Sequence, residues 1–502
     1  MTFARAVILP ARTASSRQMP ALASRLRQIR FLPLETFPGV VSFVQTPLGK
    51  AALVAAEAAV LSRRFHGWVL LAVLAAATAT AFSGKYRSRV LFFSTVGMLA
   101  FRPGWYDFAG PAAAAAKLGA LHFEAGLLRA ATLVVFFALS AMIITVARRR
   151  SQNLFVRRPV STMAGFALLL ILAGNSGFVD GYAQIYLWAF LATFVAYMWF
   201  LAYAVNDQLS GIGPKLSFEL GTLHPFWGST TVPYAKGAAY LSRVEAKTPE
   251  QLAVTQLKGL KLLLWVVMLG YAWRAVFLPV ARVWQIPTIE NALAQQAAGH
   301  ALPWSVCWAS TVFSFLSGIF YLTVSGNTIV AVARFAGFRL LRNTYRPLSA
   351  RTIAEFFGRY YYYYKELLFE FFFMPTFVRY FRRTKRVRLL FATFIAAGPA
   401  NVLFHFLRDS SYVADRGLGK ALVAFAPFAF YCAVLGLAIG LSLMRSQHRH
   451  KPRGWIRGQL VPSLSVIFFY CVMSIFNEID SPVNLTQHFI FMFRLLGSDL
   501  WM

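Results

Sequence analysis

Apolar segments long enough to cross a lipid bilayer recur along the whole chain, and they constrain its fold more than any other feature. A membrane-spanning helix needs about 17 to 25 predominantly apolar residues. Because lipid offers no partners for backbone polar groups, such segments must be helical. The sequence therefore predicts an all-α, polytopic integral membrane protein. Spans are expected near residues 67–82, 126–147, 162–177, 182–205, 259–280, 304–325, 389–407, 420–444, 460–477 and 488–501.

The composition agrees with a membrane protein and bounds the size of the bundle. Hydrophobic residues make up 58% of the chain and 48 residues are Phe, a content that a soluble globular protein could not keep out of water. Residues 89–125 fit either two more passes or a re-entrant piece. We expect about 10 to 13 transmembrane or re-entrant helices around a central tunnel.

The basic residues indicate topology rather than nucleic-acid binding. The chain has 50 Lys and Arg against 18 Asp and Glu, a formal net charge of +32, but these cations fall between apolar segments. Under the positive-inside rule the clusters at 148–158, 379–388 and 445–457 are cytoplasmic, where they can also contact the headgroups of anionic membrane lipids. Loops 280–304 and 478–487 contain at most one Lys or Arg each and are expected outside.

We expect two parts in the chain and no metal site. Residues 1–65 are predicted to be a basic cytoplasmic N-terminal arm, because residues 1–34 contain six Arg and no acid. Residues 66–502 form the multi-span membrane domain. Cys307, Cys432 and Cys471 lie in apolar surroundings without the paired spacing of a zinc site, so we expect them in the core.

His405 is an unusual residue for an apolar helix, in the segment GPANVLFHFLRD at 398–409. Asn401 precedes it by one helical turn, so both lie on one face. The helix runs outward from the basic cluster at 379–388, which places His405 toward the external half of the membrane. A satisfied structural histidine is the ordinary alternative. However, a neutral imidazole, with an unperturbed pKa of about 6.5, also suits a general base.

Residues 326–378 depart from simple hydropathy, since cations are interspersed among many aromatic residues. Such a segment cannot face lipid as plain spans, and we expect interfacial and re-entrant helices facing an internal chamber. The run Tyr360–Tyr364 is typical of an aromatic belt at the headgroup level. The cations are Arg334, Arg339, Arg342, Arg346, Arg351, Arg359 and Lys365.

The same stretch resembles the central block of the membrane-bound O-acyltransferase family. The family pattern pairs a small-residue helix with A-R-x-x-G-F-R-L-x-x-N, followed by R-P, an aromatic E-F-W-x-R-W-H and an acidic residue with aromatics. Some tens of residues further on, an apolar helix carries a near-invariant histidine, at the place of His405. The core block therefore covers residues 325–410. The matching residues are Ala333, Arg334, Gly337, Phe338, Arg339, Leu340, Asn343, Arg346, Pro347, Glu355, Phe356, Phe357, Arg359, Tyr360 and Glu370–Phe373.

The resemblance implies roles for particular residues. His405 would be the base for acyl transfer, and Tyr361 stands where relatives have a second His or an Asn, so it is the second expected catalytic residue. Asn401 could orient the imidazole or hold the acyl carbonyl. The arginines fit the phosphates of a CoA donor and those of lipids equally well. The expected substrate-binding residues are Asn401, Asn343, Arg346 and Arg359.

The expected activity is transfer of an acyl group, with acetyl favoured, from a cytoplasmic acyl-CoA or acyl-carrier thioester to a hydroxyl acceptor, without a bound cofactor. By resemblance to bacterial alginate O-acetylation proteins, the acceptor is an extracytoplasmic polysaccharide or a relay protein. A periplasmic acetyltransferase-like partner and a multi-pass location in the bacterial inner membrane are further expectations. The alternatives are a lipid O-acyltransferase, and a transporter or non-catalytic descendant, of which a transporter is disfavoured by the lack of a clear internal repeat.

Overall fold

The computed structural model describes residues 33–62, 68–82, 84–101, 125–150, 152–209, 211, 213–228, 232–300, 302–446 and 454–497. These residues form helices joined by short connections, and within these ranges the only β-type pairing is one isolated bridge, Glu245 with Phe338. Seven helices are long and apolar enough to cross a membrane, so the prediction of an all-α, polytopic membrane protein is confirmed. They are Gly126–Arg149, Gly181–Leu209, Pro249–Val283, Trp304–Phe335, Lys385–Arg408, Leu418–Arg445 and Ile456–Phe476.

Several of the expected spans are shorter than a bilayer requires. The segments predicted at 67–82 and 488–501 correspond to α5 (Trp68–Phe82, 15 residues) and α26 (Leu485–Leu495, 11 residues). An eighth span is reached if α3 (Pro38–Gln45) and α4 (Pro47–Leu61), which are bent by 94°, form one broken span. Hydropathy alone does not separate a short helix packed inside a protein from a true crossing. Of the ambiguous segment 89–125, residues 102–124 lie outside the described part.

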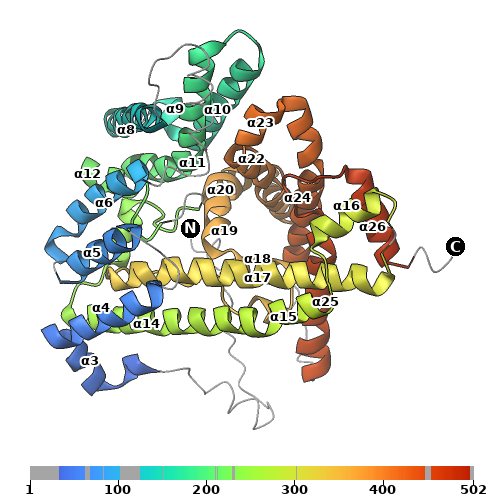
Figure 1. The fold of residues 1–502 in the computed structure, drawn as a ribbon. Coiled ribbons are helices and arrows are strands. Elements are labelled where there is room, and N and C mark those ends of the chain that lie inside the picture. The colour runs from blue at the N-terminus through green and yellow to red at the C-terminus, as the bar shows by residue number, and fades with distance from the viewer. Residues whose placement is uncertain are drawn as a thin grey trace.

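Helices α8, α9 and α10 pack against α11. A hairpin places α10 against α11, and Gly174 permits the close approach because a Cβ there would lie 2.7 Å from the Trp188 ring. Figure 1 shows α8, α9 and α10 at one edge of the molecule, with α11 leading from them to its middle. The bounds are α6 (Arg87–Phe101), α8 (Ala125–Arg149), α9 (Leu154–Arg157), α10 (Pro159–Asn175), α11 (Gly181–Leu209), α12 (Leu216–Gly221) and α13 (Ala238–Val244).

Two long helices lie side by side through the molecule, α14 (Pro249–Ala272) and α17 (Trp304–Phe335) (Figure 1). The Gln256 side chain donates a hydrogen bond of 3.0 Å to the Phe335 carbonyl and joins them. A π-helical turn (Trp273–Phe277) and α15 (Leu278–Val283) extend α14, and α16 (Ile289–Ala297) lies in the loop that follows. Part of the expected N-terminal arm packs on this pair, since α3 and α4 contact α14 and Glu35 forms an ion pair with Lys261. Residues 1–32 of that arm lie outside the described ranges.

The C-terminal half contains the candidate site. Helices α21 and α24 pack closely through glycines, because a Cβ on Gly436 would lie 2.9 Å from the Gly398 nitrogen. In Figure 1, α24 and α25 cross the far end of the α14 and α17 pair. The bounds are α18 (Ile353–Tyr360), α19 (Tyr362–Leu368), a π-helical turn (Phe369–Phe373), α20 (Met374–Arg379), α21 (Lys385–Ala397), α22 (Pro399–Arg408), α23 (Ser411–Arg416), α24 (Leu418–Ser446) and α25 (Val461–Met473).

Candidate functional site

A helix break positions the residues around His405. The span Lys385–Arg408 is divided at Gly398, and α22 restarts at Pro399, a residue suited to a first helical position because it lacks the N–H that would be left unpaired there. Asn401 and Phe404 are buried on α22, and the His405 side chain is half-buried and faces α24. The predicted placement of Asn401 and His405 one turn apart on one helix is therefore found in the structure.

The His405 imidazole is surrounded by aromatic rings. Its ring centroid lies 4.6 Å from that of Phe428, 5.2 Å from Phe404 and 5.8 Å from Tyr364. Its Nδ1 atom is buried and has no hydrogen-bond partner among the residues that the structure describes. A buried polar atom without a partner costs free energy and calls for an explanation, such as a ligand or water that completes the site.

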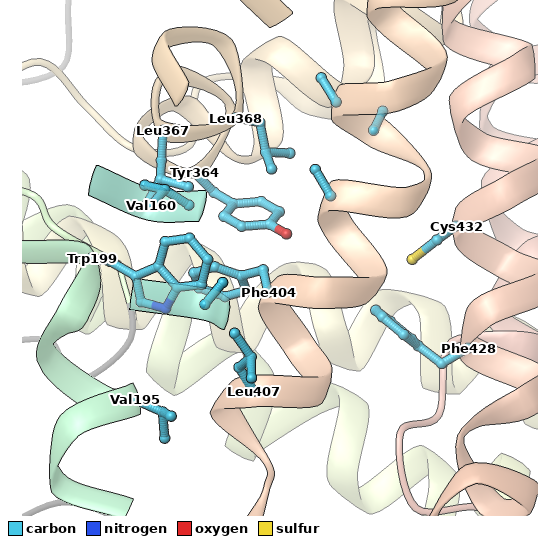
Figure 2. Close-up of a cluster of buried hydrophobic side chains, with 14 of the residues drawn as sticks. Val160, Val195, Trp199, Tyr364, Leu367, Leu368, Phe404, Leu407, Phe428 and Cys432 are labelled. Carbon is cyan, nitrogen blue, oxygen red and sulfur yellow. The ribbon is translucent and has the colours of Figure 1, made fainter. Parts of the chain in front are cut away.

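Asn401 holds a tyrosine beside the imidazole. The Tyr364 hydroxyl donates a hydrogen bond of 2.5 Å to Asn401 Oδ1, and Asn401 Nδ2 donates to the Ala397 carbonyl at 3.3 Å. Figure 2 shows the Tyr364 ring near Phe404, with its hydroxyl turned away from Trp199. The amide thus fixes the orientation of Tyr364, whose ring contacts both Phe404 and His405. Asn401 makes no direct hydrogen bond to the imidazole in the described structure.

Tyr361, the expected second catalytic residue, contacts Tyr364, and Tyr364 in turn contacts His405. The Tyr361 ring contacts those of Tyr360 at 4.1 Å, Phe357 at 5.8 Å and Tyr364 at 6.2 Å. Tyr364, which the sequence analysis did not single out, is the member of the tyrosine run that touches the imidazole. No local signal distinguishes Tyr364 within the run of five tyrosines, because its contact with the imidazole depends on how α19 packs against α22.

The tyrosine run is not the aromatic belt that its composition suggested. Tyr360, Tyr363 and Tyr364 are each less than a tenth exposed and belong to the protein core. The Tyr363 hydroxyl donates to the Leu341 carbonyl at 3.1 Å, and Tyr364 is bound to Asn401. Belt tyrosines would instead direct their hydroxyls to lipid headgroups and water, so the belt interpretation is wrong for these three residues.

Asn343 is a structural residue of the loop that follows α17. It is buried, its side-chain oxygen accepts from the Tyr363 backbone N–H at 3.3 Å, and its carbonyl accepts from the Tyr362 N–H at 3.1 Å. These bonds attach the loop to the start of α19. Asn343, which was predicted to bind substrate, therefore stabilises the start of α19, the helix that contains Tyr364.

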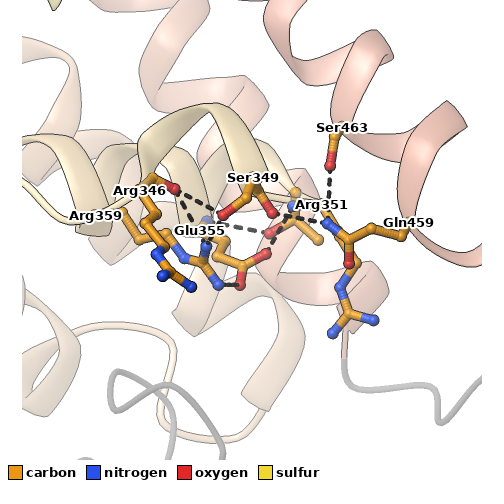
Figure 3. A network of polar contacts seen from close by, with 8 residues as sticks. Arg346, Ser349, Arg351, Glu355, Arg359, Gln459 and Ser463 are labelled. Atoms are coloured by element: carbon orange, nitrogen blue, oxygen red, sulfur yellow. Dashed lines mark hydrogen bonds and ion pairs between the residues drawn. The ribbon is translucent and has the colours of Figure 1, made fainter. Parts of the chain in front are cut away.

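Arg359 is likewise held by protein partners, and Figure 3 shows the network around it. Its guanidinium forms an ion pair with Glu355 and donates to Ser349 Oγ at 2.7 Å and to the Arg346 carbonyl at 3.3 Å. Gln459 donates to the Ser349 carbonyl at 3.0 Å and ties the loop to the segment before α25. The network therefore fixes the loop that leads into α18.

The Arg346 side chain is exposed, so its guanidinium group is accessible to a ligand. The residue has a left-handed backbone, with φ of 49°, and its guanidinium lies 5.5 Å from the centroid of the exposed Tyr345 ring. Arg342 lies 5.8 Å from the same ring. Burial lowers the pKa of Arg342 from its ordinary value, and the nearby Arg346 charge acts in the same direction. Two guanidinium groups on one tyrosine can bind a phosphate or another anion.

The expected site residues thus fall into two groups. Asn401 and His405 form one cluster with Tyr364, which was not predicted, and Tyr361 adjoins this cluster. Asn343, Arg346 and Arg359 lie in the loop and helix that precede it. No group of three or more His, Cys, Asp or Glu residues within the described ranges is placed to hold a metal ion. Comparison of the sequence with protein-family models and with curated proteins found no match.

Proposed function

We propose that the protein is a membrane-bound O-acyltransferase of the cell membrane. It would move an acyl group, with acetyl favoured, from a cytoplasmic thioester to a hydroxyl acceptor on the external side. The observation that carries the proposal is the His405 imidazole, which lies among Tyr364, Phe404 and Phe428 and has a buried Nδ1 without a partner in the described structure. Intramembrane ionisable residues with unsatisfied atoms are candidates for function.

The chemistry requires one proton acceptor in an apolar place. The acceptor hydroxyl gives its proton to the imidazole as its oxygen attacks the thioester carbonyl carbon. The carbon–sulfur bond then breaks, and the leaving thiolate takes the proton from the imidazolium. An imidazole is suited to both transfers near neutral pH. Asn401 and Tyr364 act as positioning residues, since their hydrogen bond of 2.5 Å fixes the ring that lies against His405.

The loop after α17 supports a cytoplasmic donor with phosphate groups. Arg342 and Arg346 flank Tyr345 there, and their side chains form no ion pair within the described ranges. An acyl-CoA or a phosphopantetheine-bearing carrier has the complementary charge. A bacterial inner-membrane location and a periplasmic acetyltransferase-like partner are part of the same proposal, by resemblance to alginate O-acetylation proteins.

The decisive experiment replaces His405 with Gln, which keeps the size of the side chain but cannot take a proton at neutral pH. Purified wild type and variant would be compared for transfer of radiolabelled acetyl from acetyl-CoA to glycerol and to oligosaccharides, with donor affinity measured separately. His300→Gln is the matched control, because His300 is exposed in a loop expected outside. We expect transfer to fall about a hundredfold or more in His405→Gln, with donor binding retained. Near-normal transfer in that variant would refute the assignment.

A second candidate function, transport, is favoured by one specific feature. Near the end of α11, Asn206 donates a hydrogen bond of 2.7 Å to Glu370, and Lys236 pairs with Glu366 at 2.8 Å. Paired acids and bases of this kind also occur along substrate pathways of transporters. Reconstituted vesicles that show substrate or proton flux, unaffected by His405→Gln, would favour transport over acyl transfer.

A further inference from the structure

Two adjoining depressions lie at the end of the protein opposite the basic clusters. Helix α21 starts beside the cluster at 379–388 and α22 ends at Arg408, while α24 starts at Leu418 and runs back toward the basic segment after Arg445. The depressions are therefore on the external side under the positive-inside rule. The larger has a volume of about 400 Å³, and both are lined in part by Ala424. We call the two together the external groove.

The narrower part of the external groove is close to His405. Phe406, which follows His405 on α22, lines it together with Phe425 from α24, and their ring centroids are 5.6 Å apart. Phe425 is 5.4 Å from Phe428, and Phe428 is 4.6 Å from the His405 ring. Only a short series of contacting rings thus separates the groove from the imidazole.

The arginines beside the groove are matched by aspartates. Arg408 forms an ion pair with Asp409 at 2.7 Å, and Arg416 pairs with Asp480, with one of the two bonds at 2.9 Å. Arg416 also lies 5.7 Å from the ring centroid of Tyr412, which lines the narrow part with both aspartates. Carboxylate oxygens and an aromatic face are suited to hydroxyl groups and to the apolar faces of sugar rings.

One further cation lines the larger depression. Lys420 is exposed near the start of α24, and the exposed Asp415 lies nearby on α23. The segments that form the external groove therefore contain one more acid than cation: Asp409, Asp415, Glu478 and Asp480 against Arg408, Arg416 and Lys420. Because opposite charges are interspersed around the opening, a polyanion gains little there.

The loop that forms the wall of the larger depression is held in place by its own bonds. Ser481 and His488 are 3.2 Å apart, from oxygen to Nε2, and His488 Nδ1 is 2.9 Å from the Asn484 carbonyl. The Val483 N–H donates to Ser481 Oγ at 3.3 Å. Because His488 is fully buried, these bonds are shielded from water. The wall is therefore pre-organised, which reduces the entropy cost of binding a ligand.

We propose that the external groove, formed by α22, α23, the start of α24 and the 478–484 loop, binds a neutral, hydroxyl-rich acceptor such as an oligosaccharide chain. This inference rests on the proposed function, since it names the acceptor site for the same reaction. The occupant is not a polyanion because both arginines at the rim are paired with aspartates and the acids there outnumber the cations, and it is polar because carboxylates and guanidinium groups surround the opening. Its bound end would lie next to the ring series that leads to His405.

Binding is measured directly on the full chain in detergent, by saturation-transfer NMR and calorimetry with a neutral hexose oligosaccharide. Two variants alter the groove in different ways: Tyr412→Ala removes its aromatic face, and Ala424→Trp fills the junction of the two depressions. Asp180→Asn is the matched control, because Asp180 is exposed on another loop of the same side. We expect each groove variant to weaken binding at least tenfold at unchanged thermal stability, and the control to bind normally.

Several results would overturn the groove proposal. It is refuted if the wild type does not bind the neutral oligosaccharide, if both groove variants bind it normally, or if a charged polyuronate or anionic lipid vesicles bind the groove in its place. His405→Gln separates this proposal from the proposed function. The His405→Gln variant should still bind the oligosaccharide but should not transfer the acyl group. If the wild type binds the oligosaccharide but transfers no acyl group, the proposed enzymatic function is contradicted while the binding site remains supported.

Discussion

Replacing Glu219 with Gln should stabilise the protein in a strongly pH-dependent way. Glu219 lies on α12 with a fully buried side chain. Its Oε1 accepts a hydrogen bond of 3.0 Å from Gln208 Nε2, and its Oε2 has no partner among the residues described. Burial, with a smaller contribution from the Asp207 charge, raises the pKa of Glu219 from 4.5 to about 9. The folded protein therefore holds a proton that the unfolded chain loses near pH 4.5.

The pKa shift sets the size of the effect. The contribution of protonated Glu219 to stability is complete below pH 4.5 and is lost as the pH rises from 4.5 to about 9. A pH of 7 is about 2.5 pH units above the unfolded pKa, and at about 1.36 kcal/mol per unit the loss there is about 3 kcal/mol. Gln has the shape of the protonated acid and does not titrate. Glu219→Gln should thus raise the free energy of unfolding by about 3 kcal/mol at pH 7 and by less than about 1 kcal/mol at pH 5.

The assay is denaturant unfolding in mixed micelles, followed by tryptophan fluorescence at pH 5, 7 and 8.5 for the wild type and the variant. Glu250→Gln serves as the matched control, because Glu250 is exposed at the start of α14. The difference in the free energy of unfolding between Glu219→Gln and wild type should grow with pH. The corresponding difference for Glu250→Gln should not change with pH. A difference that is constant across the three pH values would refute the argument from burial.

Other predictions concern the site and the topology. His405→Ala should lower acyl transfer about a hundredfold to ten-thousandfold, measured with labelled donor at equal protein stability. Tyr364→Phe removes the hydroxyl bonded to Asn401 and should lower transfer more than Tyr361→Phe, which keeps that bond intact; equal rates for both variants would contradict the positioning role of Tyr364. A cysteine at position 482 should react with a membrane-impermeant label in intact cells and one at position 384 should not, and the reverse pattern would overturn the topology.

The all-α membrane fold and the approximate positions of the long helices could be predicted from the sequence, because the hydropathy and charge of a segment are properties of that segment alone. Helix Leu418–Arg445 is apolar along its length and ends at basic residues, so its limits could be predicted within a few residues. Shorter helices such as α26 could not be predicted as non-spanning. The predicted span at 488–501 corresponds to the 11 residues of α26, which include Gln487, His488 and Arg494 and pack against α16 and α17. Such packing depends on contacts distant in sequence, which hydropathy does not contain.

The same limit applies to the candidate site. His405 and Asn401 could be placed together because they are one turn apart on one helix. Tyr364 could not, because its contact with them depends on how α19 packs against α22, and five consecutive tyrosines offer no local reason to prefer one of them. The arginines were predicted as substrate ligands from their charge and their places in the core block. The structure assigns Arg359 to a protein network with Glu355, while the Arg346 side chain faces solvent.

The two ends of the core block differ in charge in a way that separates two kinds of ligand. On the side of the loop after α17, Arg342 and Arg346 flank one tyrosine without matched acids in the described structure, an arrangement that attracts anions. On the external side, the arginines at the ends of α22 and α23 are paired with aspartates, so no such excess exists at that rim. A phosphate-bearing donor and a neutral acceptor would therefore each be favoured at a different end. Under the proposed function the acyl group is transferred between these two ligands at His405, on the helix that ends at Arg408.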